Sequence, residues 1–155
     1  MATREERNRR DPDLGVLAGR LLFAVQRELF ATLAAQGFAD LHPRHGAVLA
    51  YLDAGGVRAT ELSRLSGQHK QVIGTMIDEL EGLGYVERRP DPADRRAKLI
   101  SPTERGLSQM RAADRIMADI QERHARRVGR EAFAGFKAIL VDVTEHQRRP
   151  RSDAT

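Results

Sequence analysis

The sequence contains no cysteine and no tryptophan, and aromatic residues make up only 5% of its 155 residues. Without cysteine there is no disulfide framework, no thiolate zinc site and no thiol redox sensor. The low aromatic content, together with abundant Arg, Ala and Leu, favours helices over sheets. We therefore expect a mainly helical protein of one domain, or one domain with an appended dimerisation element.

Long apolar runs are missing as well. No stretch approaches the roughly 18 apolar residues that a membrane span needs, and no apolar run of the secretory type follows the charged segment 1–10. We expect a cytoplasmic protein with no membrane contact. The 26 Lys and Arg residues against 22 Asp and Glu give a net charge of +4, so the total charge alone does not require a nucleic-acid partner.

The patterns of common catalytic and metal sites are also absent from the sequence. It has no glycine-rich phosphate loop and no nucleophile elbow. His42 and His45 are three residues apart, but no carboxylate stands one turn further on to complete a metal site. We expect no enzymatic activity, no cofactor and no metal.

Apolar residues at steps of three and four predict amphipathic helices along most of the chain. After a disordered start, the expected helices span residues 13–36, 43–54, 60–65, 69–83, 103–128 and 130–146. Thr60 is a plausible N-cap, and Ser66-Gly67-Gln68 suits the turn of a helix-turn-helix. Tyr51 and Val72 belong to the stripes that we expect to be buried.

A β-hairpin is predicted directly after the helix at 69–83. Two β-prone segments, Tyr85–Arg89 and Lys98–Ser101, flank a long tip with two prolines and two aspartates. Between residues 88 and 98, five Lys and Arg face two Asp. Arginine at such a tip suits a DNA minor groove, where the potential is most negative. The order helix, helix, wing indicates a DNA-binding domain.

Three neighbouring segments of the sequence carry a resemblance to a known family. They are Leu80-Glu81-Gly82-Leu83-Gly84-Tyr85-Val86-Glu87-Arg88, then Asp91-Pro92-Ala93-Asp94-Arg95-Arg96-Ala97-Lys98-Leu99, and then Thr103-Glu104-Arg105-Gly106. Together they resemble the MarR family of bacterial winged-helix transcriptional regulators. The resemblance extends over essentially the whole chain through the order and length of the helices. It implies that the terminal helices form a dimer interface and that Asp94 orients Arg96 for minor-groove insertion. Pro102 departs from the leucine usual there, and Thr75 stands where many relatives carry arginine, so base preference cannot be transferred.

Candidate DNA contacts lie on the second helix of the helix-turn-helix and on the wing, with Arg44 near the start of the expected helix at 43–54 as a candidate for phosphate. The expected contacts are Arg44, His69, Lys70, Gln71, Thr75, Arg95, Arg96 and Lys98. The helix residues can reach base edges in the major groove or phosphates, and Arg96 suits the minor groove, with Arg95 or Lys98 on phosphate. The ordinary alternatives are a hydrated helix face and a solvated turn in which Arg95 or Arg96 pairs with a neighbouring aspartate.

Many relatives in the resembled family bind a small aromatic or anionic effector between the dimer helices and the winged domain. Arg20, His42 and His45 are the candidate effector residues, because imidazole and guanidinium can hold a carboxylate or phenolate. A histidine at a helix end is also often a cap or a surface residue.

The domain boundaries follow from these elements. We expect a tail and dimerisation helix at 1–36, a winged helix-turn-helix at 37–101, dimerisation helices at 102–147 and a disordered tail at 148–155. The apolar stripes of the end helices exceed what one small domain can cover, which favours a two-fold homodimer over an ordinary bundle. Such a dimer suits a pseudo-palindromic operator with half-sites about 10 base pairs apart.

These observations predict a sequence-specific DNA-binding transcriptional regulator, a homodimeric repressor released by a small effector. Two other hypotheses stay open. A nonspecific architectural DNA-binding protein would use the same wing without a preferred palindrome. A winged-helix module that binds a partner protein would not retain DNA at physiological salt.

Overall fold

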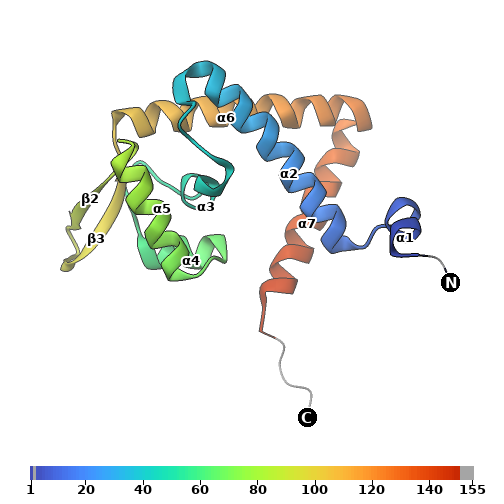
Figure 1. Cartoon of the computed structure of the whole chain (residues 1–155), viewed down its shortest axis with the longest axis horizontal. Coiled ribbons are helices and arrows are strands. Elements are labelled where there is room, and N and C mark those ends of the chain that lie inside the picture. The colour runs from blue at the N-terminus through green and yellow to red at the C-terminus, as the bar shows by residue number, and fades with distance from the viewer. Residues whose placement is uncertain (2, 151–155) are drawn as a thin grey trace, which may run out of the picture. The chain divides into compact units, whose positions relative to one another are not determined.

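The computed structural model describes Met1 and residues 3–150 (Figure 1). The strands are β1 (Val57–Arg58), β2 (Val86–Asp91) and β3 (Asp94–Pro102), and the helical elements are α1 (Arg4–Arg10), α2 (Leu14–Leu33), η1 (Ala34–Phe38), η2 (Pro43–His45), α3 (Gly46–Leu49), α4 (Ala59–Ser66), α5 (Lys70–Gly82), α6 (Glu104–Val128) and α7 (Arg130–Arg148). The predicted mainly helical fold with a winged helix-turn-helix is confirmed. None of the helices in the described residues has the length and apolar character to cross a bilayer.

The chain divides into two compact units, the first ending at Ile116 within α6. In the first unit, α4 and α5 form the helix-turn-helix. Gly67 ends α4 with a φ of 72°, in the left-handed region that favours glycine. The Ser63 hydroxyl donates to the Gln68 carbonyl (2.6 Å), and His69 Nδ1 accepts from the Gln71 N–H (3.1 Å). The turn and the first residue of α5 are therefore fixed by local hydrogen bonds, as the sequence predicts.

The three strands form an antiparallel sheet in the order β1-β3-β2. Its hairpin is tighter than predicted, because β3 begins at Asp94 and only residues 92–93 form the turn. Asp91 explains the difference: its Oδ1 accepts from the Ala93 N–H (2.9 Å), and its Oδ2 accepts from Arg58 Nε (2.7 Å). Arg95 and Arg96 consequently lie on a strand and not in a long loop.

The core of the first unit joins α4, α5 and the sheet. Its fully buried side chains include Leu62, Ile73, Ile77, Leu80, Tyr85 and Ile100. Val72 and Tyr51, expected in buried stripes, are exposed, Val72 by 44%. For Val72 the reason is geometric, because a helix buries a limited arc and Ile73, Met76 and Leu80 already occupy it on α5.

Several predicted element boundaries were wrong. The expected disordered start contains α1, where Thr3 and Glu6 form a capping box: the Glu6 N–H donates to Thr3 Oγ1 (3.2 Å) and the Thr3 N–H to Glu6 Oε2 (2.7 Å). Thr60 does not cap α4, which begins at Ala59, and the second predicted helix ends at Leu49. Arg148 of the predicted tail closes α7, and residues 151–155 of that tail lie outside the described residues.

The second unit contains the rest of α6 and α7, joined at Gly129. The rings of His124 and Phe133 stack across this corner with centroids 6.3 Å apart. Glu122 accepts from Arg126 Nε (2.8 Å) and from Arg130 Nη2 (2.6 Å). Although α7 is well formed, it buries none of its residues within the single chain.

Candidate nucleic-acid interface

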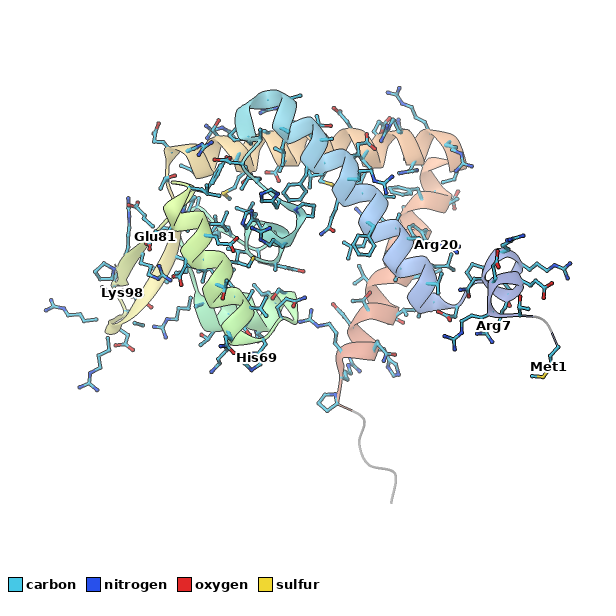
Figure 2. All side chains as sticks on the ribbon, in the orientation of Figure 1. Met1, Arg7, Arg20, His69, Glu81 and Lys98 are labelled. Atoms are coloured by element: carbon cyan, nitrogen blue, oxygen red, sulfur yellow. The ribbon has the colours of Figure 1, made fainter. Side chains whose placement is uncertain are left out.

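The first turns of α5 present an exposed polar surface. His69, Lys70, Gln71 and Thr75 are all exposed, so the predicted helix residues lie on the surface around the start of α5. Figure 2 shows His69 at the end of α5 next to α4, with Glu81 towards the opposite end. Thr75 Oγ1 donates to the Gln71 carbonyl (3.0 Å). Among the described residues, the Lys70 ammonium has no acidic partner.

The outer part of the hairpin carries unpaired cations. Arg95, Arg96 and Lys98 are exposed on β3, where Figure 2 labels Lys98. Asp94 Oδ1 accepts from the backbone N–H of Arg96 (3.0 Å). This bond fixes the strand at Arg96 without using its guanidinium. In the part of the chain that the structure describes, no carboxylate pairs with these three cations.

The base of the same hairpin is close to neutral. Arg88 donates to Asp78 (2.5 Å) and to Glu81 (2.6 Å), both on α5. The hydrogen bond to Asp78 is the main reason that the pKa of Arg88 lies above its usual value. Arg89 donates through Nε to Glu87 (2.8 Å). The net positive charge is thus concentrated on the outer part of the wing, where another molecule can reach it.

A second anchor holds the wing at its turn. The guanidinium of Arg58, on β1, donates from Nε and Nη2 to Oδ2 of Asp91, at 2.7 Å and 2.5 Å. The N–H of Ala93 and the Arg58 pair hold the pKa of Asp91 below its usual value. Asp91 therefore stays ionised and joins β1 to the hairpin. This contact gives the projecting wing a fixed direction.

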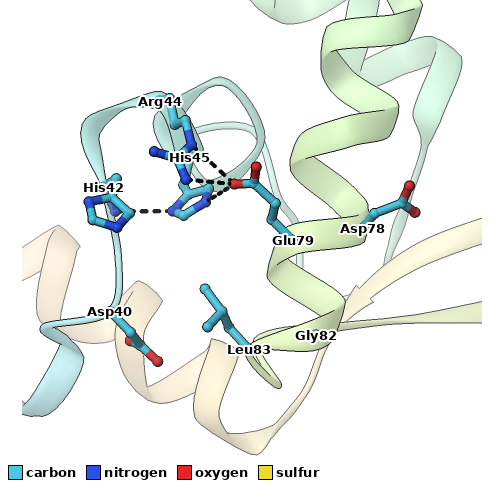
Figure 3. A pocket seen from close by; sticks show the side chains of 8 residues that line it. All are labelled: Asp40, His42, Arg44, His45, Asp78, Glu79, Gly82 and Leu83. Carbon is cyan, nitrogen blue, oxygen red and sulfur yellow. Dashed lines mark hydrogen bonds and ion pairs between the residues drawn. The ribbon is translucent and has the colours of Figure 1, made fainter.

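Arg44 is not a free cation. Its Nε donates to Glu79 Oε2 of α5 (3.1 Å), and His45 Nε2 lies 2.8 Å from the same oxygen (Figure 3). His45 Nδ1 accepts from the His42 N–H (3.0 Å), so the ring proton is on Nε2 and donates to Glu79. Hydrogen bonds from His45 and Arg44 lower the pKa of Glu79. This cluster attaches the segment before α3 to α5.

The three candidate effector residues do not form one site. A pocket of about 470 Å³ is lined by His42 and His45 together with the acidic side chains Asp40, Asp78 and Glu79. His45 is only 1% exposed, and both of its ring nitrogens are engaged within the protein. Arg20 does not line this pocket, and its guanidinium lies within 3.4 Å of the Asn8 carbonyl oxygen. Of the three, His42 is the one exposed in this pocket.

Sequence reasoning missed three residues that shape this surface. Val72 was assigned to the core, whereas Arg58 and Glu79 were not singled out. Of these, only Glu79 could have been singled out from the sequence, because it is one of three acidic residues, with Asp78 and Glu81, that cluster near the end of α5. The partner of Arg58 is 33 residues away in the sequence, and no local pattern indicates it. In the described residues, no group of three or more His, Asp and Glu side chains is arranged to hold a metal ion.

Comparisons with known proteins agree with this geometry. A model of the MarR family matches residues 39–97. CouR from Rhodococcus jostii RHA1, solved with p-coumaroyl-CoA, is 28% identical with a TM-score of 0.70, covering 84% of this chain and 91% of that one. A MarR-family transcriptional regulator from Rhodococcus sp. RHA1 is 26% identical with a TM-score of 0.67, covering 84% and 93%.

A third solved structure supports the same fold at lower identity. The transcriptional repressor CouR bound to a 23-mer DNA duplex is 24% identical with a TM-score of 0.70, covering 93% of this chain and 99% of that one. No curated protein sequence matches this chain at a significant level. The family model covers the helix-turn-helix and most of the wing, and the two CouR structures cover 84% and 93% of the chain. Residues 39–97 thus match the MarR family, and the chain is similar, over 84% of its length, to a solved MarR-family regulator.

Proposed function

We propose that this protein is a sequence-specific DNA-binding transcriptional regulator that acts as a homodimer, represses at a pseudo-palindromic operator and is released by a small molecule. The observation that carries the proposal is the separation of paired from unpaired cations. Arg88 and Arg89 are neutralised by acidic neighbours, whereas no acidic side chain among the described residues pairs with Arg95, Arg96 or Lys98 on the same hairpin. A surface of unpaired cations beside an exposed helix N-terminus suits a polyanion with grooves.

Each element has a role in this proposal. The start of α5 enters the major groove, where Gln71 and Thr75 reach base edges and Lys70 and His69 lie close to phosphates. Arg96 enters the adjacent minor groove, positioned through the Asp94 contact to its backbone, and Arg95 and Lys98 contact phosphate. Arg44 contributes to positioning α5 through Glu79 and not to phosphate binding.

The homodimer is proposed from exposed apolar side chains on the end helices. On α2 these are Leu14, Leu17, Leu21, Leu22 and Phe23, and on α7 they are Phe136, Ile139, Leu140, Val141 and Val143. Leaving so many large apolar groups in water is unfavourable, and a second copy removes them from it. A two-fold dimer presents two copies of α5 and two wings to one duplex.

Effector release is proposed as a population shift. An effector weakens DNA binding only if it binds the DNA-incompetent arrangement of the two winged domains more tightly than the competent one. The pocket beside His42 is suited to this role because it is also lined by Asp78, Glu79 and Gly82 of α5. CouR was solved with p-coumaroyl-CoA, and this compound is the first probe to add to the protein–operator complex, although the three carboxylates that line the pocket beside His42 do not favour an anion there.

The test of DNA binding uses two arginines of the same hairpin. An operator is first selected from random duplexes with the wild-type protein, and its affinity is then measured by fluorescence anisotropy. Arg96→Ala should weaken binding by roughly 1 to 3 kcal/mol, the value of a specific groove contact. Arg89→Ala, which removes a cation already paired with Glu87, is the matched control and should weaken binding much less.

Three outcomes contradict the proposal in different ways. Equal losses for both variants would remove Arg96 from the groove and leave only a diffuse charge effect. Failure to enrich any sequence, with affinity that collapses with salt on all duplexes alike, would indicate an architectural DNA-binding protein. No retention of any duplex at physiological salt would indicate a module that binds protein.

A further inference from the structure

Val72 is an apolar side chain on the surface that is proposed to enter the major groove. It is the third residue of α5 and is 44% exposed, while the residues that pack into the core are Ile73, Met76, Ile77 and Leu80. Valine is a poorer helix former than alanine, and here its two methyl groups do not contribute to the core. The packing of the single chain therefore gives no reason for valine at this position.

Val72 and Gln71 are both exposed, and each is a helix-surface neighbour of the exposed Thr75, at spacings of three and four. Thr75 donates its hydroxyl hydrogen to the Gln71 carbonyl, so it offers another molecule a methyl group and an accepting oxygen. The Gln71 side chain has no partner within the described residues. Its amide can donate and accept at the same time.

This combination has a specific counterpart among the base pairs. In the major groove, the 5-methyl group of thymine is the apolar feature, and adenine offers an acceptor at N7 beside a donor at N6. A glutamine amide matches adenine with two hydrogen bonds, and valine and threonine methyl groups match the thymine methyl. The Thr75 oxygen can accept from an exocyclic amino group, N6 of adenine or N4 of cytosine, so the preference for A·T rests on the methyl groups and on Gln71.

Guanine has few suitable partners on this helix. The commonest contact to guanine is an arginine or lysine that donates to O6 and N7. The only cation in α5 is Lys70, at its first residue, where phosphate contact is favoured. The unpaired cations of the wing lie on a separate element and supply the charge that holds the duplex.

We infer that Val72, together with Gln71 and Thr75, reads A·T base pairs in each half-site, with the Val72 methyl groups packed against the 5-methyl group of a thymine. The inference rests on the proposed function, because it assumes that α5 enters the major groove. It goes further by naming the base pairs and the residue that selects them.

The test removes the thymine methyl groups one at a time. The probe is the operator selected from random duplexes, resynthesised with deoxyuridine in place of one symmetry-related pair of thymidines at each position. Deoxyuridine pairs like thymidine but has no 5-methyl group. At one position of the operator, the substitution should lower the affinity by about fourfold for each half-site. This is the change that corresponds to about 0.8 kcal/mol per buried methyl group. Deoxyuridine at flanking thymidines is the matched control and should have no effect.

The protein side of the test is Val72→Ala. Because alanine is the better helix former and Val72 is exposed, this variant should fold at least as stably as the wild type. Its affinity for the thymidine operator should fall by a similar factor. Deoxyuridine at the sensitive position should then cause no further loss, since the two methyl partners form one contact.

The inference fails if deoxyuridine is tolerated at every position, if Val72→Ala remains fully sensitive to it, or if the selected half-site consists of G·C pairs. Each of these results leaves sequence-specific binding intact. The proposed function fails separately, at the earlier step, if the selection yields no preferred sequence.

Discussion

Gly106 of α6 lies against the backbone of Tyr85, the residue before β2. A Cβ atom at this position would lie 2.1 Å from the Tyr85 carbonyl oxygen, far inside contact distance. The neighbouring Thr103 closes the same junction, because its hydroxyl donates to the Gly84 carbonyl (2.5 Å) and accepts from the Gly106 N–H (3.1 Å). The Thr-Glu-Arg-Gly segment of the sequence is therefore explained by packing at a junction, independently of any contact with DNA.

Replacing Gly106 with alanine should destabilise the fold. The added methyl group meets backbone, which cannot move aside as a side chain can, and we expect a loss of about 3 kcal/mol in the free energy of unfolding. Urea denaturation followed by circular dichroism measures this change. Gly82→Ala is the matched control, since a Cβ at Gly82 meets nothing within 4 Å. That variant should be as stable as the wild type or gain up to about 1 kcal/mol. Equal stability of the two variants would show that the junction can open without cost.

Arg105 completes the junction. Its guanidinium lies 4.2 Å from the centre of the Tyr85 ring, donates to the Leu83 carbonyl (2.7 Å) and pairs with Asp40 (3.0 Å). The Tyr85 hydroxyl donates to Asp40 as well (2.5 Å). Burial opposes the ionisation of Asp40, but these hydrogen bonds outweigh it and lower the pKa of this carboxyl. Asp40, Tyr85 and Arg105, from three segments distant in sequence, thus meet at the ionised carboxylate of Asp40.

At the scale of elements, the sequence predicted those that local signals define. The apolar spacing predicted α5 to within one residue at each end and the start of α2 to within one residue. The structure adds the caps: His69 Nδ1 accepts from the Gln71 N–H (3.1 Å), and Asp13 Oδ1 accepts from the Val16 N–H (2.9 Å). Local patterns did not reveal β1, because a strand of two residues exists only through its pairing with Leu99 and Ile100. The tight hairpin was missed for a similar reason, since Asp91 holds it through Arg58.

In the candidate site too, local sequence patterns were predictive and contacts between distant residues were not. The spacing of charges and polar residues was sufficient to place Gln71, Thr75 and Arg96 on exposed surfaces, which the structure confirms. The charge count included Arg88 in the cationic excess of the hairpin, because its pairing with Asp78 and Glu81 depends on how α5 and the hairpin pack. The burial of His45 was not predictable either, since its partner Glu79 is 34 residues away.

The corner between α6 and α7 depends on one carboxylate. Glu122 accepts hydrogen bonds from Arg130 and Arg126, which lower its pKa from 4.5 to about 2. Because the pKa is lower in the folded protein, the stabilisation by this group is fully present above about pH 4.5 and is lost as the pH falls towards 2. The contribution of Glu122 should therefore be insensitive to pH in the neutral range.

Arg130→Gln should raise the pKa of Glu122 towards 4.5, because the largest contribution to its shift is the hydrogen bond from Arg130. NMR titration of the glutamate carboxyl carbons measures the value directly. Lys137→Gln is the control, since Lys137 contacts Gln121 (2.5 Å) and should leave the titration of Glu122 unchanged. A pKa that does not move in Arg130→Gln would mean that the ion pair does not form in solution.

At the scale of the whole molecule, the proposed regulation requires that the two winged domains of a dimer bind one operator at the same time. One winged domain contacts one half-site, and linking two of them makes the second contact effectively intramolecular, which raises the affinity for a palindrome without any new contact. The exposed apolar side chains of α2 and α7 carry this linkage in our proposal. Phe23 is 69% exposed and Ile139 is 66% exposed in the single chain, so both should become buried when two copies associate.

Ile139→Asp tests the linkage without touching the reading surface. A carboxylate in an apolar interface must be desolvated, so the dimer should dissociate at micromolar concentrations, as sedimentation equilibrium would show. Helix content should persist, because Ile139 is exposed in the single chain. Affinity for the full operator should fall by more than about tenfold while that for an isolated half-site stays unchanged. Asp142→Asn, another exposed position of α7, is the control and should remain dimeric. If Ile139→Asp kept both the dimer and its operator affinity, α7 would not be the linkage, and the apolar face of α2 alone would have to supply it.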